Sequence, residues 1–176
     1  MSDSRRNFLL KSFSATSAAW LAANWPAEVA AAEKAQGMGA FTYLTREQAA
    51  DVDAMAAQIY PTTDTPGARE AQVIYFIDLA LVTFAQDKQD ICAKGLADLP
   101  SHTGGKAFAT LPSNQQIAVL TSIEKTPFFK AVRDLTIMGM FASPQHGGNY
   151  KKVGWTQIGY DDSLNFRAPF GAYDKA

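Results

Sequence analysis

Apolar residues recur at helical spacing along most of this chain, and no segment alternates apolar and polar residues as a strand would. Spacings of three and four positions predict amphipathic helices, because they place side chains on one face. The pattern predicts five helices, over residues 46–59, about 68–86, about 88–99, from 113 and from 127. The second is apolar over much of its circumference, so we expect it at the centre of a bundle. The predicted fold class is all-α, a compact bundle of about five helices with an irregular, aromatic-rich C-terminal tail.

Capping signals mark the starts of three of these helices. Thr45 and Gln48 stand three positions apart before the first helix, and their side chains can satisfy its free backbone amides as a capping box. Ser113 and Gln116 repeat that spacing at the start of the fourth helix. Pro127 suits the first turn of the fifth helix, because its missing N–H is not needed there.

Three stretches break the helical pattern. Residues 61–68 are rich in Pro, Thr, Asp and Gly and predict a rigid polar loop, and residues 101–106 predict a second loop. The C-terminal 155–176 segment holds five aromatic residues, Trp155, Tyr160, Phe166, Phe170 and Tyr173. Their spacing suits neither helix nor strand. This tail should either fold back over the bundle or form a docking surface, since aromatic anchors are enriched at binding sites.

The N-terminus is organised like an export signal. Arg5 and Arg6 are followed by Phe8 and Leu9, and then by a short apolar stretch rich in Ala and Ser. A basic segment, an apolar segment and small residues at the exit are the parts of a removable signal, and the paired arginine indicates the twin-arginine type. The small residues at the exit place cleavage after Ala32. The alternative is an Ala-rich first helix with two chance arginines.

These features predict a signal peptide over residues 1–32, a linker over 33–44, the helical bundle over 45–154 and the tail over 155–176.

The chain carries 16 basic and 17 acidic residues, a net charge of −1. A near-neutral chain without basic runs argues against nucleic acid as a partner, because such binding depends on neutralising phosphates. The twin-arginine signal predicts a periplasmic protein.

Candidate catalytic chemistry is sparse. Cys92 is the only cysteine, and His102 and His146 are the only histidines, so we expect no zinc site. No phosphate loop, dinucleotide fingerprint or nucleophile-elbow motif is present. Cys92 is either a small buried apolar side chain or one half of a disulfide with a partner subunit. We therefore predict no catalytic, cofactor-binding or metal-binding residues in this chain.

Residues 59–68 read Ile-Tyr-Pro-Thr-Thr-Asp-Thr-Pro-Gly-Ala. This segment resembles the I-x-P-x-T-D-T-P-G-A stretch of the gluconate 2-dehydrogenase subunit 3 family. Other matching pieces are the paired-arginine leader, the Phe76-Ile77-Asp78 triplet, and the Gly147-Gly148 pair followed by Trp155 and Gly159-Tyr160. The resemblance covers most of the chain from about Leu44 to Tyr160.

The resemblance implies a small exported subunit of a periplasmic flavin dehydrogenase. The large subunit, of the glucose–methanol–choline oxidoreductase type, would bind FAD and oxidise a sugar or sugar acid. It commonly lacks its own signal, so it would cross the twin-arginine translocase folded and bound to this chain. Electrons would pass to a cytochrome c subunit or another acceptor, and a partner could hold the complex at the membrane.

We expect contact with the flavin subunit at the polar loop and the aromatic tail. The candidate interface residues are Thr62, Asp64, Pro66, Cys92, Trp155, Tyr160, Phe166 and Phe170. Two other functions remain open. The chain could be a stand-alone periplasmic binding or scaffold protein, or a small periplasmic enzyme that uses His102 or His146.

Overall fold

The computed structural model describes residues 40–162, while residues 1–39 and 163–176 lie outside the described part of the chain. The elements in chain order are α2 (Arg46–Ile59), α3 (Val73–Val82), η1 (Gln86–Lys88), α4 (Gln89–Thr103), η2 (Phe108–Thr110), α5 (Ser113–Ile123), α6 (Pro127–Phe141), η3 (Pro144–His146), η4 (Tyr150–Lys152) and α7 (Val153–Gln157). The described residues form helices and turns without any strand, which confirms the all-α prediction. The short helix α7 is additional to the five predicted helices.

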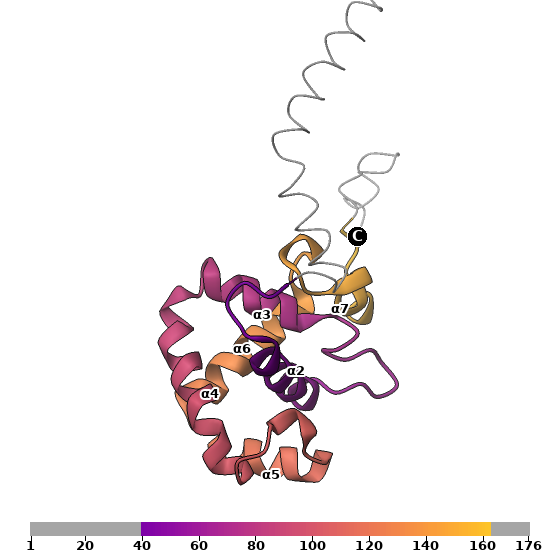
Figure 1. Cartoon of the computed structure of the whole chain (residues 1–176). Coiled ribbons are helices and arrows are strands. Elements are labelled where there is room, and N and C mark those ends of the chain that lie inside the picture. The colour runs from indigo at the N-terminus through magenta and orange to yellow at the C-terminus, as the bar shows by residue number, and fades with distance from the viewer. Residues whose placement is uncertain (1–39, 163–176) are drawn as a thin grey trace, which may run out of the picture.

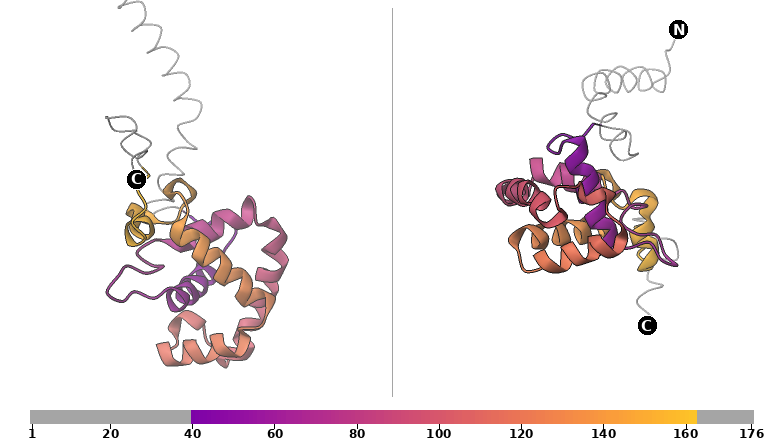
Figure 2. Two further views of the ribbon diagram at one scale, coloured as in Figure 1. Left: turned by 180° about the vertical axis from the view of Figure 1, so that it is seen from behind. Right: turned by 60° about the horizontal axis from the view of Figure 1, so that its bottom comes forward.

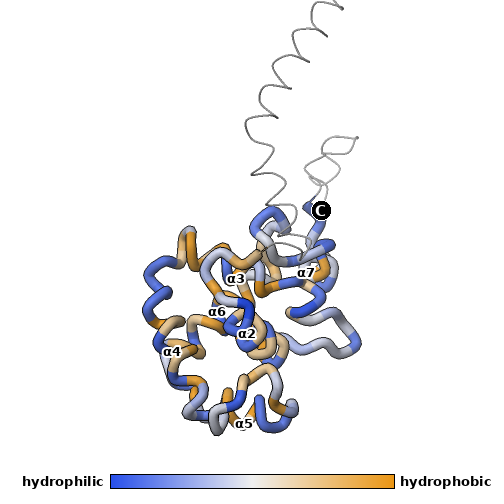
Figure 3. Tube along the Cα trace, viewed as in Figure 1, coloured by the Kyte–Doolittle hydropathy of each residue, from blue (hydrophilic) through white to orange (hydrophobic). Residues whose placement is uncertain are grey.

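Helices α3 and α6 pack against each other at the centre of the bundle, and α2 contacts both. In Figure 1, α5 lies at the bottom and α7 at the upper right, and Figure 2 shows the same bundle from two further sides. The largest fully buried side chains of these helices are Met55, Val73, Ile77, Leu81, Val132, Leu135 and Met140. Figure 3 shows α3 coloured mostly as hydrophobic, in keeping with its central position.

The local signals at the starts of α2 and α6 act as predicted. The Thr45 hydroxyl accepts a hydrogen bond from the Gln48 N–H at 3.2 Å, and the Gln48 side chain accepts one from the Thr45 N–H at 3.0 Å. These two bonds complete the capping box of α2. Pro127 occupies the first turn of α6, and the Thr126 side chain caps that helix by accepting from the Phe129 N–H.

The capping box predicted at Ser113 and Gln116 is wrong. Ser113 is already helical, and Gln116 is 6% exposed inside the domain. The Gln116 amide donates to the Phe108 carbonyl at 3.1 Å and accepts a hydrogen bond from Gln58 at 2.7 Å. Tertiary partners on η2 and α2 therefore take the side chain that a local cap would have used.

Two helices have bounds that differ from the prediction. Helix α3 begins at Val73 instead of about 68, because the preceding turn ends at Gln72 in a left-handed conformation with φ 53°. It ends at Val82 instead of about 86, because Thr83 leaves the helical conformation with ψ −95°. Helix α4 runs on to Thr103, so the first residues of the loop predicted over 101–106 are helical. Gly104, with φ 65°, ends that helix in a conformation that glycine adopts without strain.

A buried carboxylate fixes the chain just before α2. Asp78 on α3 is 2% exposed and accepts the backbone N–H groups of Thr42, Tyr43 and Leu44 at 2.7, 2.9 and 2.9 Å. Three N–H donors satisfy a charge that would otherwise be costly to bury. Residues 41–44 therefore belong to the folded domain and not to the linker expected over 33–44.

Candidate partner-binding surface

The loop between α2 and α3 is closed by its own hydrogen bonds. The Ala68 N–H donates to the Tyr60 carbonyl at 2.9 Å and closes the base of the loop. The Glu70 carboxylate accepts the Thr62 hydroxyl at 2.6 Å and the Gly67 N–H at 2.8 Å. These bonds hold the pKa of the Glu70 carboxyl below its ordinary value, and the bond from Thr62 has the largest effect. The loop is thus held in one conformation before any partner binds.

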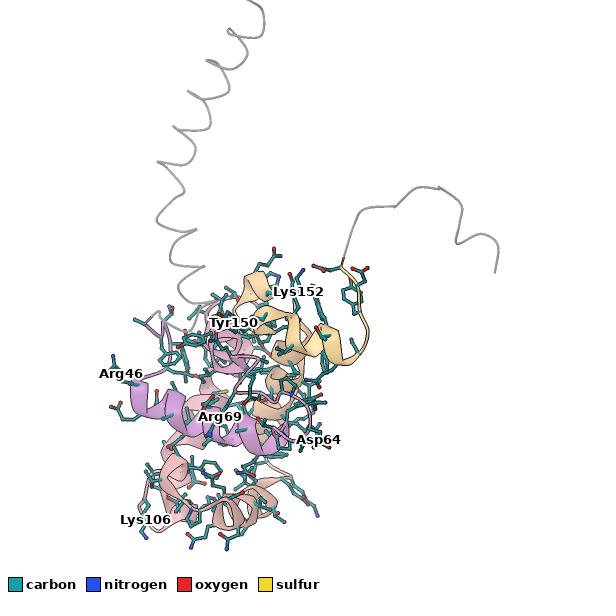
Figure 4. All side chains as sticks on the ribbon, turned by 90° about the vertical axis from the view of Figure 1, so that its right-hand side faces the viewer. Arg46, Asp64, Arg69, Lys106, Tyr150 and Lys152 are labelled. Carbon is teal, nitrogen blue, oxygen red and sulfur yellow. The ribbon has the colours of Figure 1, made fainter. Side chains whose placement is uncertain are left out.

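Gly67 lets the two arms of this loop approach each other closely. A β-carbon there would lie 2.5 Å from the Thr62 nitrogen and 2.7 Å from the Tyr60 carbonyl oxygen, which backbone atoms cannot accommodate. The loop projects from the bundle at the right of Figure 1. Thr62 and Asp64 are exposed on it, and Figure 4 labels Asp64 where the loop faces the viewer.

The segment after α6 is organised around one buried side chain. Asn149 is 0% exposed; its amide donates to the Ala142 carbonyl at 2.9 Å and accepts the Gly154 N–H at 2.8 Å. Gly154 lies so close to α6 that a β-carbon would be 2.0 Å from the Met140 carbonyl oxygen. Asn149 and Gly154 therefore seat α7 directly on the C-terminal half of α6.

Gln157 joins this segment to the loop. The Gln157 amide donates to the Pro66 carbonyl at 2.6 Å and accepts the Tyr60 hydroxyl at 2.8 Å. Nearby, the Tyr150 N–H donates to the Ala71 carbonyl at 3.0 Å. Two stretches that are far apart in the sequence thus form one continuous surface, seen from its own side in Figure 4.

The α7 end of this surface is apolar. Ile158 is 61% exposed and Tyr160 is 55% exposed. The half-buried Trp155 ring packs edge to face with Tyr160 at a centroid distance of 4.9 Å, and its indole N–H donates to the Phe141 carbonyl at 2.7 Å. Trp155 is therefore anchored to the bundle and only partly open to a partner. It lies within α7, so the irregular tail predicted from residue 155 begins with a helical turn.

We call the exposed side of the loop and of α7 the loop–α7 surface; its residues are Thr62, Asp64, Pro66, Trp155, Ile158 and Tyr160. Five of these are candidates from the sequence. Ile158 was missed, although an exposed apolar residue between Trp155 and Tyr160 extends the same surface. The polar residues that hold the surface together, Glu70, Asn149 and Gln157, were also missed, because only the fold reveals their partners.

The remaining candidates lie elsewhere. Cys92 on α4 is 3% exposed, and burial raises the pKa of its thiol to about 11. A protonated thiol in the core is placed for packing and not for a disulfide with another chain. Phe166 and Phe170 lie outside the described residues.

The two histidines belong to different elements. His102 on α4 lies 3.3 Å from the Asp98 carboxylate, and His146 ends η3 beside Gln145. Within residues 40–162 no group of three His, Cys, Asp or Glu side chains could hold a metal ion. None of the helices in that range has both the length and the apolar character needed to cross a membrane.

The fold and this surface define a class of protein, a small all-α domain in which two distant segments of the chain form one surface. The sequence profile of the gluconate 2-dehydrogenase subunit 3 family matches residues 46–162, and the chain belongs to that family. The resemblance seen in the sequence is thereby confirmed. The family name designates one subunit of a multi-subunit dehydrogenase, so the chain is an accessory protein of the subunit 3 type. Searches of curated proteins and of solved structures gave no significant match.

Proposed function

We propose that this chain is the non-catalytic small subunit of a periplasmic FAD-dependent dehydrogenase that oxidises a sugar or sugar acid. The large subunit, of the glucose–methanol–choline type, holds the FAD and performs the oxidation. The observation that carries the proposal is the family match, which spans both the α2–α3 loop and α7 and so includes the whole loop–α7 surface.

The leader supports a role in export. Arg5 and Arg6, followed by Phe8 and Leu9, have the order of a twin-arginine signal. That route carries folded proteins, so a flavin subunit loaded with FAD crosses while bound to this chain. In the periplasm the small subunit stabilises the flavin subunit, and a cytochrome c subunit or another acceptor takes the electrons.

The loop–α7 surface is the proposed docking site for the flavin subunit. Its hydrogen-bonded loop is already ordered, which reduces the conformational entropy lost on binding. Trp155, Ile158 and Tyr160 offer a partly exposed apolar cluster, and such aromatic anchors carry much of the energy of many interfaces. The exposed Thr62 and Asp64 provide the polar rim beside it.

A matched pair of isoleucines tests the docking site. Ile158→Asp places a charge in the proposed interface, whereas Ile117→Asp places one on α5, where the side chain is 53% exposed. We expect I158D to weaken binding of the flavin subunit by roughly 2 kcal/mol, about 30-fold in Kd. I117D should leave the Kd unchanged. Thermal unfolding of both variants checks that the domain remains folded, and equal affinities for the flavin subunit would contradict this choice of surface.

A conservative change in the leader tests co-export. The double substitution Arg5→Lys and Arg6→Lys keeps the charge but removes the paired-arginine signature. We expect the flavin subunit and its dehydrogenase activity to remain in the cytoplasm together with this chain. A periplasmic enzyme exported by another route serves as the fractionation control. Undiminished periplasmic dehydrogenase activity would show that the flavin subunit does not depend on this leader.

A further inference from the structure

A second apolar surface lies where α3 ends beside α6. Phe84 is 58% exposed and Met138 is 47% exposed, although both are large apolar side chains. A hollow of about 540 Å³ lies between Phe84 and Met138, and another of about 300 Å³ lies between Phe84 and Leu79. Phe76 and His146 border both hollows. We call this feature, two hollows that Phe84 borders in common, the Phe84 groove.

The groove is open within the described residues, and exposed apolar side chains gathered in a groove are typical of a binding site. The Phe84 ring lies 5.9 Å from the Phe76 ring, and both rings border both hollows. An occupant that fits both hollows needs two apolar groups a short distance apart.

The end of the described chain is linked to this groove through two short turns. Asp162, its last residue, is bound by the Lys152 ammonium of η4 at 2.8 Å. The neighbouring turn η3, which ends at His146 on the rim of the groove, packs against both η4 and α3. Contacts through η4 and η3 therefore link the start of the C-terminal segment to the rim of the groove at His146.

The C-terminal segment carries two phenylalanines at a chain length from Asp162 that can span the distance to the groove. An extended chain spans about 3.3 Å per residue, so Phe166 can lie about 13 Å and Phe170 about 26 Å from Asp162. Pro169 stands between them, and the residue before a proline favours an extended conformation. Residues four apart in an extended chain lie on the same face, so the segment can present both rings to the two hollows.

We propose that the C-terminal segment 163–176 docks in the Phe84 groove of its own chain, with Phe166 and Phe170 filling the two hollows. The proposal does not depend on the flavin partner. It assigns these two phenylalanines to the fold of the subunit, and it leaves the loop–α7 surface as the site for docking of the flavin subunit.

The Met138 methyl group reports on the groove. NMR spectra of the leaderless chain (residues 33–176) with ¹³C-labelled methionine methyls are compared with those of the double variant Phe166→Ala and Phe170→Ala, and Met138→Leu identifies the signal. We expect the double variant to shift the Met138 methyl signal and to remove its contacts with aromatic protons of the tail. The buried Met55 methyl should keep its position. Tyr160→Ala, which removes an exposed aromatic side chain outside the groove, should leave Met138 unchanged.

A chain that stops at Asp162 gives a second measurement. We expect its Met138 signal to resemble that of the double variant, and addition of a peptide of residues 163–176 to restore the original position. If the Met138 methyl signal has the same position in the original chain, in the double variant and in the truncated chain, the proposal is overturned. The groove would then be open to another protein. A signal in the full leaderless chain that moves on dilution would also overturn it, because it would show that the groove holds the segment of a second copy.

Discussion

Asp78 is the residue on which the start of the domain depends most directly. Its buried carboxylate accepts three backbone N–H groups from residues 42–44. We expect Asp78→Ala to lower the free energy of unfolding by about 3 kcal/mol or more, because three amides lose a charged acceptor. Asp64→Ala, in the exposed loop, is the matched control and should change stability by less than about 0.5 kcal/mol. Urea unfolding measures both, and similar values for the two variants would show that the residues before α2 contribute little.

Cys92 gives a prediction about alkaline pH. Burial raises the pKa of its thiol from 9.0 to about 11, so the folded chain keeps a proton that the unfolded chain releases. The free energy of unfolding therefore falls as the pH rises from about 9 to about 11. Burial also raises the pKa values of Tyr43 and Tyr75, which contribute in the same direction.

Comparison with Cys92→Ala isolates the contribution of the thiol. The variant loses a buried sulfur and should be less stable at pH 7, by about 1 kcal/mol. Since the variant has no thiol to titrate, the difference in free energy of unfolding between it and the original chain should shrink between pH 9 and 11. A difference that stays constant over that range would contradict the assigned burial of the thiol. A thiol reagent should react with Cys92 at pH 8 only after unfolding.

Residues with local partners are those that sequence predicts well. Thr45 and Gln48 cap α2 as expected, because both bonds join atoms three positions apart. Gln116 has the same spacing from Ser113 but bonds to Phe108 and to Gln58 instead. Its partners come from other elements, so no local pattern could indicate them.

At the scale of elements, α7 depends on a glycine that helix propensity disfavours. Alanine is the better helix former by about 1 kcal/mol, yet a β-carbon at Gly154 would lie 2.0 Å from the Met140 carbonyl oxygen. We expect Gly154→Ala to push α7 off α6 and to lower stability by about 1–3 kcal/mol. Thr156→Ala in the same helix is the control, because its side chain is exposed.

Trp155 reports on that displacement without any label. It is the only tryptophan after residue 32. Its indole N–H donates to the Phe141 carbonyl, a bond that G154A should break. We expect the fluorescence emission of the leaderless chain to shift to the red in G154A and to remain unchanged in T156A. An unshifted emission in G154A would show that α7 tolerates the methyl group.

The elements also show where periodicity stops being informative. The long amphipathic helices α2, α4, α5 and α6 were predicted, since each has apolar residues on one face over several turns. Helix α7 is too short to show a period and is set by Asn149, whose bonds to Ala142 and Gly154 are tertiary. The start of α3 was misplaced because the left-handed Gln72 carries no glycine signal.

For the whole molecule, the sequence predicted the all-α class and the family. It also named both stretches of the candidate surface, the loop at residues 61–68 and the aromatic residues Trp155 and Tyr160. What it could not predict is that these stretches are joined, because Gln157 makes its bonds to Pro66 and Tyr60 only after the bundle brings the two together. The folded surface is therefore a property of the whole domain.

The most direct test of the proposed function is affinity purification of the tagged leaderless chain from its native cells, with an absorbance spectrum of what co-elutes. We predict a larger protein with the spectrum of bound flavin, and dehydrogenase activity of the eluate on a sugar or sugar acid. A chain that elutes alone and colourless, from cells shown to express the candidate dehydrogenase, would contradict the subunit role and favour a stand-alone binding or scaffold protein. Activity of the purified chain without any partner would instead favour a small enzyme.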